Sequence, residues 1–195
     1  TPGLSGSLDY TSAGDLHFNT TGGWWSHSNG DHGTGVLSTG DDNGTIYGVA
    51  TFTFNSINLS NLVNVTFEGK NACILKTQNH GSIVIGTSLD VSGGNGRDSA
   101  AVNKGIGGLA ILGGSPGGDS YDYNGEIEED GKGLGGGKGR VWSDEGGGAG
   151  YGSQGSRGGN SEMAFSATYG DENLNHMHGG SGGGGGSGGG IFVKG

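Results

Sequence analysis

Histidines cluster with carboxylates and amides at two places where a metal ion could be held. His176 and His178 are two residues apart, which puts both imidazoles on one side of an extended segment. His27 and His32 flank residues 29–31 (Asn-Gly-Asp) in a similar way. Zinc or copper accepts such donors, but neither cluster offers four ligands at a recognised spacing. A polar turn without a metal ion is therefore the favoured interpretation of both.

An acidic stretch between residues 119 and 130 offers carboxylates for calcium, with Asp122, Glu126 and Glu128 as the candidate ligands. Calcium binds through several carboxylate oxygens. The glycine of this stretch is not where an EF-hand loop needs it, and no helical pattern flanks it. A solvated loop is the favoured alternative, and the sequence predicts no other cofactor.

The sequence offers no convincing enzyme motif. It has no P-loop lysine and no HExxH, and the Gly-x-Ser-x-Gly spacing occurs only within glycine-rich runs, around Ser115, Ser181 and Ser187, where no strand-to-helix elbow is expected. No pair of carboxylates is singled out for a lyase or glycosidase reaction. We therefore expect that the protein is not an enzyme.

Aromatic residues offer a second kind of chemistry, stacking on sugar rings. The candidates are Trp24 and Trp25, an unusual pair that follows two glycines, and Tyr121. Such residues would make the protein a lectin-like adhesin. The same tryptophan pair could instead plug one end of the fold or dock into a neighbouring subunit, and we favour this second reading because large apolar residues are scarce.

Composition excludes several classes of protein. The chain has 195 residues with 51 glycines, 2 prolines and 1 cysteine, and its net charge is −10. Near absence of proline and of a Gly-X-Y period excludes collagen. No apolar run is long enough to span a membrane as a helix, and one cysteine cannot form an intrachain disulfide. The negative charge argues against nucleic acid as a partner.

Glycine divides the chain unevenly, with 14 glycines in residues 1–92 and the other 37 in residues 93–195. We expect three regions: an N-terminal extension over 1–45 that exchanges strands with a neighbour, β-helix-like strands over 46–92, and a packed glycine-rich array over 93–195 that ends in a short strand. Short β-branched and aromatic stretches, separated by turn residues, predict strands at 45–54, 57–59, 63–67, 72–76, 82–86 and 89–91. In the first strand, Ile46 falls on the same face as Phe52 and Phe54.

The predicted fold class is all-β with almost no α-helix, because no amphipathic 3.6-residue pattern occurs. Coils of a short parallel β-helix are favoured over hairpins of a sandwich. The glycine array is expected to form a polyglycine II-like bundle, in which extended threefold helices bond to one another laterally through their backbones. Ordinary loops draped over the β-helix are the competing reading.

Parts of residues 50–195 resemble a glycine-rich family of large secreted surface proteins. The similar segments are FTFNSINL at 52–59, VNVTFEG at 63–69, GSIVIGTSLDVSGG at 81–94, the glycine-rich 146–152, Tyr-Gly-Asp at 169–171, and the Gly-Ser run from 179 that closes on the apolar strand 191–193. The resemblance implies an extracellular, β-helix-like module of surface, adhesive or matrix proteins, with no catalytic residues to transfer.

An extracellular location also fits the sequons and the cysteine. Asn19, Asn43, Asn58 and Asn64 begin Asn-x-Ser/Thr sequons and are the candidates for glycosylation. Asn64 and Thr66 should point away from the apolar residues of their strand. The chain starts at Thr1 without an apolar leader, as a mature secreted chain would. Cys73 lies inside an apolar strand and is expected to be a buried, inert thiol.

Self-assembly is the leading functional expectation: a structural subunit of a filament or fibrous surface layer, whose partners are copies of itself. Apolar residues near the two ends of the chain are the predicted assembly interface, namely Leu8, Tyr10, Leu16, Phe18, Ile191, Phe192 and Val193. Head-to-tail contacts of this kind generate open fibres. A surface adhesin that binds extracellular glycans is the alternative.

Overall fold

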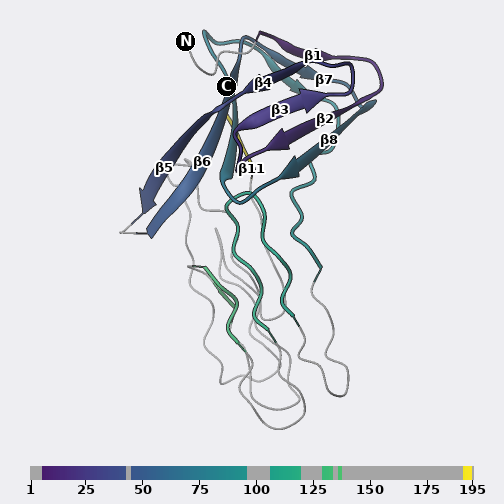
Figure 1. Ribbon diagram of the computed structural model, residues 1–195. Helices are drawn as coiled ribbons and strands as arrows, with labels where there is room; N and C mark the ends of the chain where they lie inside the picture. The colour runs from purple at the N-terminus through teal and green to yellow at the C-terminus, as the bar shows by residue number, and fades with distance from the viewer. Residues whose placement is uncertain are drawn as a thin grey trace. The chain divides into compact units, whose positions relative to one another are not determined.

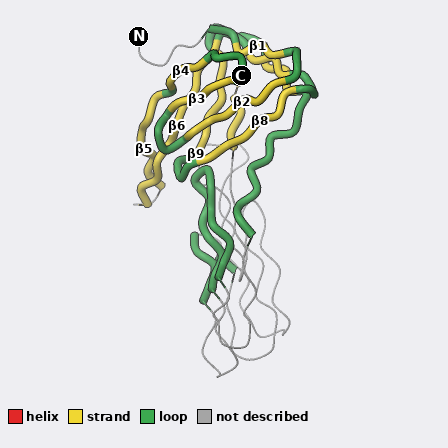
Figure 2. Tube along the Cα trace, turned by 45° about the vertical axis from the view of Figure 1, so that its right-hand side comes forward, coloured by secondary structure: helices red, strands yellow, loops and turns green. Residues whose placement is uncertain are grey.

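The computed structural model describes residues 6–42, 45–95, 106–119, 129–133, 136–137 and 191–194. The chain divides into two compact units, one of Thr1–Val91 with Ile191–Gly195 and one of Ser92–Gly190. The described residues contain strands and no helix, as the colours of Figure 2 show. The predicted all-β class is therefore confirmed for this part of the chain.

All of the strands found among the described residues belong to the first unit, and Figure 1 labels most of them. In chain order they are β1 (Leu8–Tyr10), β2 (Gly14–Asn19), β3 (Trp24–His27), β4 (His32–Thr34), β5 (Val36–Asp42), β6 (Thr45–Phe54), β7 (Ile57–Leu59), β8 (Val63–Glu68), β9 (Ala72–Thr77), β10 (Ile83–Ile85) and β11 (Ile191–Lys194). They form three sheets with the strand orders β1-β7-β10, β11-β9-β6-β5 and β4-β3-β2-β8.

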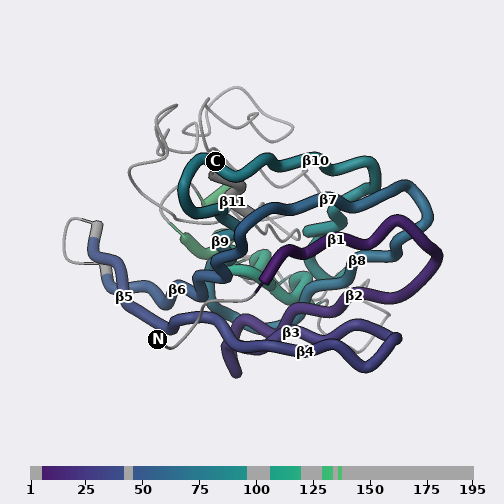
Figure 3. The backbone as a smooth tube through the Cα atoms, turned by 90° about the horizontal axis from the view of Figure 1, so that it is seen from above, coloured from purple at the N-terminus to yellow at the C-terminus, as the bar shows by residue number. Residues whose placement is uncertain are grey.

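Parallel pairing joins stretches of chain that follow the same order. β1 pairs with β7 and β2 with β8, both at a separation of 49 residues, so Leu8 lies opposite Ile57 and Gly14 opposite Val63. Figure 3 shows β1 beside β7 and β2 beside β8. Because both pairs keep one separation, residues 8–19 lie on residues 57–68 without a shift in register.

The next stretch of chain continues the pattern at a shorter separation. β9 pairs in parallel with β6, with Ala72 opposite Val49. β10 pairs in parallel with β7, with Ile83 opposite Ile57, and Leu89 forms a parallel bridge to Val65. The segments β6, β7 and β8 are thus covered, in the same order, by β9, β10 and Leu89.

Antiparallel strands are confined to the N-terminal half of the first unit. β3 pairs with β2, and β4 with β3, so these two strands extend their sheet beyond β2. β5 pairs with β6 and forms the edge of its sheet. The predicted N-terminal extension over 1–45 is thus built into the sheets of this unit.

An apolar core lies between the three sheets. Alternate residues of β6 point into it, and Ala50, Phe52 and Phe54 have no exposed surface. The ring of Phe52 meets Phe18 of β2 edge-on, with centroids 5.1 Å apart. The other buried apolar residues include Leu8, Leu16, Ile57, Leu59, Val63, Val65, Ala72 and Leu75. Every sheet contributes to this core.

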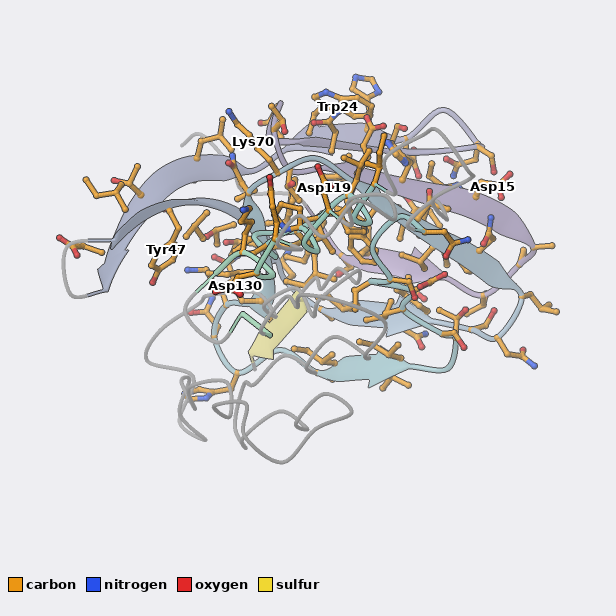
Figure 4. The ribbon with its side chains drawn as sticks, turned by 90° about the horizontal axis from the view of Figure 1, so that it is seen from below. Asp15, Trp24, Tyr47, Lys70, Asp119 and Asp130 are labelled. Atoms are coloured by element: carbon orange, nitrogen blue, oxygen red, sulfur yellow. The ribbon has the colours of Figure 1, made fainter. Side chains whose placement is uncertain are left out.

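Ile46 departs from the expected core face, because its side chain is 72% exposed. It shares the face of Phe52 and Phe54, but β9 begins only opposite Val49. Residues 45–48 therefore belong to a two-stranded ribbon with β5, which projects from the other strands of its unit (Figure 1). Figure 4 shows Tyr47 beside this ribbon.

The predicted strands are found with small changes at their ends. Those at 45–54 and 57–59 match β6 and β7, and 63–67 and 72–76 are each one residue longer as β8 and β9. The strand expected at 82–86 shortens to β10, and that at 89–91 is only the bridge at Leu89. Ile191–Lys194 forms the expected C-terminal strand and pairs in parallel with β9.

Glycine segments of the second unit bond laterally through their backbones. The amide of Lys132 donates to the carbonyl of Pro116 at 2.9 Å, and that of Glu129 donates to the carbonyl of Asp119 at 2.9 Å. The two contacts run antiparallel and are three residues apart on both segments. On the other side, Gly117 donates to the carbonyl of Gly108. Residues 116–119 thus lie between two neighbouring segments.

Close approach of these segments depends on glycine. A Cβ atom on Gly118 would overlap the carbonyl oxygen of Glu129, and one on Gly107 would overlap that of Gly117. Both glycines are buried. At Gly94, by contrast, a Cβ would meet only Leu109, at an ordinary contact distance of 3.5 Å. Close packing of these segments therefore requires glycine at positions 107 and 118, but not at position 94.

Gly118→Ala should destabilise the second unit by about 1–3 kcal/mol, the usual effect of forcing an extra group into a packed site. Gly94→Ala is the matched control, and we expect it to be neutral. Hydrogen exchange of the amides in residues 106–119 and 129–133 measures the difference. Equal exchange rates in the two variants would contradict the lateral packing of these segments.

Candidate functional site

A ladder of polar side chains follows the 49-residue register on the outer surface of the first unit. Its members are Asp9, Asp15, His17 and Asn19 from β1 and β2, and Asn58, Asn64, Thr66 and Glu68 from β7 and β8. We call these eight residues the outer polar ladder. Figure 4 shows one of them, Asp15, at the periphery of the unit.

Amides of the ladder face carboxylates on the neighbouring strand. The Nδ2 atom of Asn58 donates to Asp9 Oδ1 at 2.9 Å, and that of Asn64 donates to Asp15 Oδ1 at 2.9 Å. Asn19 donates to Glu68 in the opposite sense. In-register parallel strands place equivalent residues over one another, and pairing acid with amide avoids the repulsion of two stacked carboxylates.

His17 and Glu68 form an ion-pair geometry within the ladder. The Nε2 atom of His17 lies 3.2 Å from Glu68 Oε1, and its Nδ1 atom lies 3.0 Å from the Thr66 hydroxyl. Hydrogen bonds from His17 and Asn19 hold the pKa of the Glu68 carboxyl below its ordinary value. The ring of Trp24 lies beside His17, with the ring centroids 5.4 Å apart and the planes tilted by 51°.

Three of the four N-terminal residues predicted as an assembly interface are core residues, and the fourth, Tyr10, is only half-buried. Leu8, Leu16 and Phe18 have no exposed surface. Their strands already pair with β7 and β8 of the same chain. These three side chains cannot meet a neighbouring molecule while this fold is intact, which corrects the prediction. For Ile191, Phe192 and Val193, the structure gives their backbone pairing with β9.

The two adjacent tryptophans have different environments. Trp25 is 6% exposed and packs edge-on against Phe54, with ring centroids 5.7 Å apart. It belongs to the core, so it cannot stack on a sugar. Trp24 is 39% exposed and stays available for such a contact. Tyr121 lies outside the described residues.

Tyr10 and His27 form a second cluster beside the turn that joins β3 to β4. Their rings are stacked, with centroids 3.8 Å apart and planes 3° apart. The Tyr10 hydroxyl donates to Asp31 Oδ2 at 3.0 Å, and Asn29 Nδ2 donates to the same oxygen at 2.8 Å. Burial and the bond to Asp31 raise the pKa of the Tyr10 phenol. The bonds from Asn29 and Tyr10 lower the pKa of the Asp31 carboxyl.

A cavity of about 390 Å³ opens next to this cluster. It is lined by residues 9–13, from the end of β1 into the turn before β2, and by residues 27–29 at the β3–β4 turn. Most of these lining residues are polar. Pairing of β1 with β7 positions Asp9 and Tyr10 in the first wall, and stacking on Tyr10 positions His27 in the second.

The metal candidates Asp122, Glu126, Glu128, His176 and His178 lie outside the described residues. Within the described part of the chain, no group of three or more His, Cys, Asp or Glu residues is placed to hold a metal ion. The same part contains no helix that is long and apolar enough to cross a membrane.

Three of the four sequon asparagines belong to the outer polar ladder, and Asn43 lies outside the described residues. The predicted orientation of Asn64 and Thr66 is confirmed, since both are exposed beside the buried Val63 and Val65. The amides of Asn19, Asn58 and Asn64 are engaged with carboxylates. Glycosylation at any of them would leave the Nδ2 atom with one N–H, so the sugar and the carboxylate would have to lie on the same nitrogen.

Cys73 is buried in β9, as predicted. Burial raises the pKa of its thiol to about 12, because the thiolate would lose its hydration. The thiol is therefore protonated at neutral pH. A protonated, inaccessible thiol is a poor nucleophile.

The sequence carries a signal for the ladder. Residues 8–20 and 57–69 share an alternation of apolar and polar positions, with Asp9 and Asn58 equivalent, and Asp15 and Asn64 equivalent. A search for an internal repeat at a separation of 49 residues would have found it. The cavity had no comparable signal, because its two walls are brought together only by the fold.

Lowering the pH should destabilise the first unit through Glu68. A carboxyl whose pKa is lower in the folded protein contributes stability above its unfolded pKa, and this contribution is lost as the pH falls through the folded value. Thermal unfolding of wild type and Glu68→Gln should therefore differ most at neutral pH and converge below the ordinary value of 4.5. A constant difference at every pH would exclude this linkage.

Phe18→Ala should cost about 3–5 kcal/mol of unfolding free energy, because it opens a cavity in the core. Trp24→Ala removes a larger but partly exposed ring and should cost clearly less. Urea denaturation followed by circular dichroism compares the two. A smaller loss of unfolding free energy in Phe18→Ala than in Trp24→Ala would contradict the placement of Phe18 in the core.

Comparison with known proteins adds no functional assignment. No protein-family profile, curated protein or solved structure matches the chain. The outer polar ladder, the edge strands and the cavity are therefore the features from which a function has to be argued.

Proposed function

We propose that this chain is an extracellular structural protein that assembles with copies of itself into a filament or a fibrous surface layer. Its first unit would be a short parallel β-helix and its second a polyglycine II-like bundle. The observation that carries the proposal is the in-register parallel pairing of residues 8–19 with 57–68 and of β6-β7 with β9-β10. Stacked coils of this kind are typical of solenoid scaffolds.

The β-helix reading is supported by the order of the pairs. In such a fold each coil lies on the previous one, so strands pair in parallel and in chain order. The chain does this twice, from β1-β2 to β7-β8 and from β6-β7-β8 to β9-β10-Leu89. The antiparallel strands β3, β4 and β5 are an insertion between β2 and β6.

The polyglycine reading is supported by the spacing of backbone hydrogen bonds in the second unit. Contacts between residues 116–119 and 129–132 recur after three residues on both segments. A threefold helix returns to the same side every third residue, whereas a strand does so every second. Buried glycines at 107, 108, 117, 118 and 131 fit this close lateral packing.

The edge of β5 is the best-supported route to self-association. β5 is seven residues long and ends its sheet, and it contains neither lysine nor proline, which commonly block such edges. Val36 and Leu37, at its start, are 46% and 49% exposed. An edge of this kind offers backbone donors and acceptors to a strand of another copy. This edge replaces the buried N-terminal residues as the candidate interface.

Assembly should depend on ionic strength. The chain carries a net charge of −10, so copies repel one another at low salt. At about 0.15 M salt this repulsion is screened beyond about 8 Å. Two copies can then approach closely enough for their edge strands to pair, because the electrostatic repulsion between them is much weaker.

Leu37→Lys should reduce assembly, because it places a charge on the pairing edge. Leu62→Lys is the matched control, since Leu62 is also an exposed apolar residue (58%) but lies in the turn between β7 and β8. Negative-stain microscopy and sedimentation velocity at physiological salt compare both variants with wild type. We expect large assemblies for wild type and Leu62→Lys, and a shift to monomers for Leu37→Lys. A monomeric wild type would overturn the proposed function.

A further inference from the structure

We propose that the cavity beside Tyr10 and His27 binds a neutral saccharide. This site is separate from the assembly edge on β5. Its volume of about 390 Å³ lies within the range of small-molecule sites, about 300–1,000 Å³. A pocket with a few convergent polar groups and an aromatic wall is the usual form of such a site.

One polar atom in its wall lacks a partner. The backbone amide of Asn29 donates to His27 Nδ1 at 3.2 Å, so in the neutral imidazole the proton sits on Nε2. The Nε2 atom is buried and has no hydrogen-bond partner among the described residues. Buried donors are nearly always paired in folded proteins. A ligand hydroxyl could pair with this donor only after the His27 ring turns, because the atom has almost no exposed surface.

Gly14 lets the His27 ring pack closely against the start of β2. A Cβ on Gly14 would lie 2.6 Å from His27 Nε2 and 2.9 Å from the Ser28 hydroxyl. Gly14 begins β2, directly after the cavity wall formed by residues 9–13. The absence of a side chain at this position makes room for the His27 ring and the Ser28 hydroxyl, and both residues line the cavity.

The charges around the cavity select a neutral, hydroxyl-rich ligand. Its lining includes Asp9 and no lysine or arginine. The Asp31 carboxylate accepts a hydrogen bond from Asn29 of its second wall. An anion would be repelled by these carboxylates. Hydroxyls can donate to Asp9 and exchange hydrogen bonds with Ser12 and Ser28. The ring pair of Tyr10 and His27 offers an apolar surface to the C–H groups of a sugar.

Two substitutions at the cavity test this site, each with a matched control. Asp9→Asn and Asp15→Asn remove equivalent ladder carboxylates, but only Asp9 lines the cavity. Ala13→Trp fills the cavity, and Ile46→Trp places the same ring on the exposed β6 ribbon. The probes are neutral glucose, galactose, mannose and N-acetylglucosamine, followed by saturation-transfer NMR, with inorganic phosphate as the charged comparison.

We expect at least one neutral sugar to bind wild type in the millimolar range and phosphate not to bind. Asp9→Asn and Ala13→Trp should weaken binding about tenfold or more, whereas Asp15→Asn and Ile46→Trp should leave it unchanged. Near-UV circular dichroism shows whether each variant is folded, and if Ala13→Trp is not, the two aspartate variants decide. Absence of binding by all four sugars, tighter binding of phosphate, or equal effects of Asp9→Asn and Asp15→Asn would overturn the proposal.

Discussion

The parallel register between residues 8–19 and 57–68 is the constraint on which the first unit depends. It pairs the backbones of β1 and β2 with those of β7 and β8, and the same shift of 49 residues aligns the side chains on both faces. Inward, it brings Leu8 over Ile57 and Leu16 over Val65. Outward, it brings Asp9 and Asp15 against asparagine amides. A slip of one residue would reverse both faces at once, so core and ladder specify the register together.

The two units satisfy their backbone groups by different means. In the first, sheets cover an apolar core with Phe18, Phe52 and Phe54 fully buried. In the second, the described segments bond laterally where Gly107 and Gly118 leave no room for a Cβ. Both means require regular lateral pairing of extended chain. Proline would remove donors in either, which agrees with only 2 prolines in 195 residues.

The sequence predicted strands well where apolar residues alternate and poorly where glycine is frequent. β6 and β7 were found at their full predicted length, since β-branched and aromatic residues define them. β3, β4 and β5 were missed because glycines at 30, 33, 35 and 40 are typical of loops. The apolar pattern of one strand also does not tell which other strand it pairs with. Phe18 therefore seemed free for a neighbouring molecule, although its partners lie 49 residues further along the same chain.

The insertion between β2 and β6 explains why the candidate interaction surfaces lie where they do. Both β2 and β6, which flank it in sequence, pair in parallel with later strands. The insertion adds β3 and β4 beyond β2 and leaves β5 as an antiparallel edge. Its β3–β4 turn also supplies His27 and Ser28, the second wall of the cavity. One excursion of the chain thus creates an edge suited to a strand of another copy and a pocket suited to a small ligand. Strand pairing at the edge joins like-charged molecules, so salt should promote it. Binding of a neutral sugar depends on hydroxyl contacts, so salt should leave it unchanged.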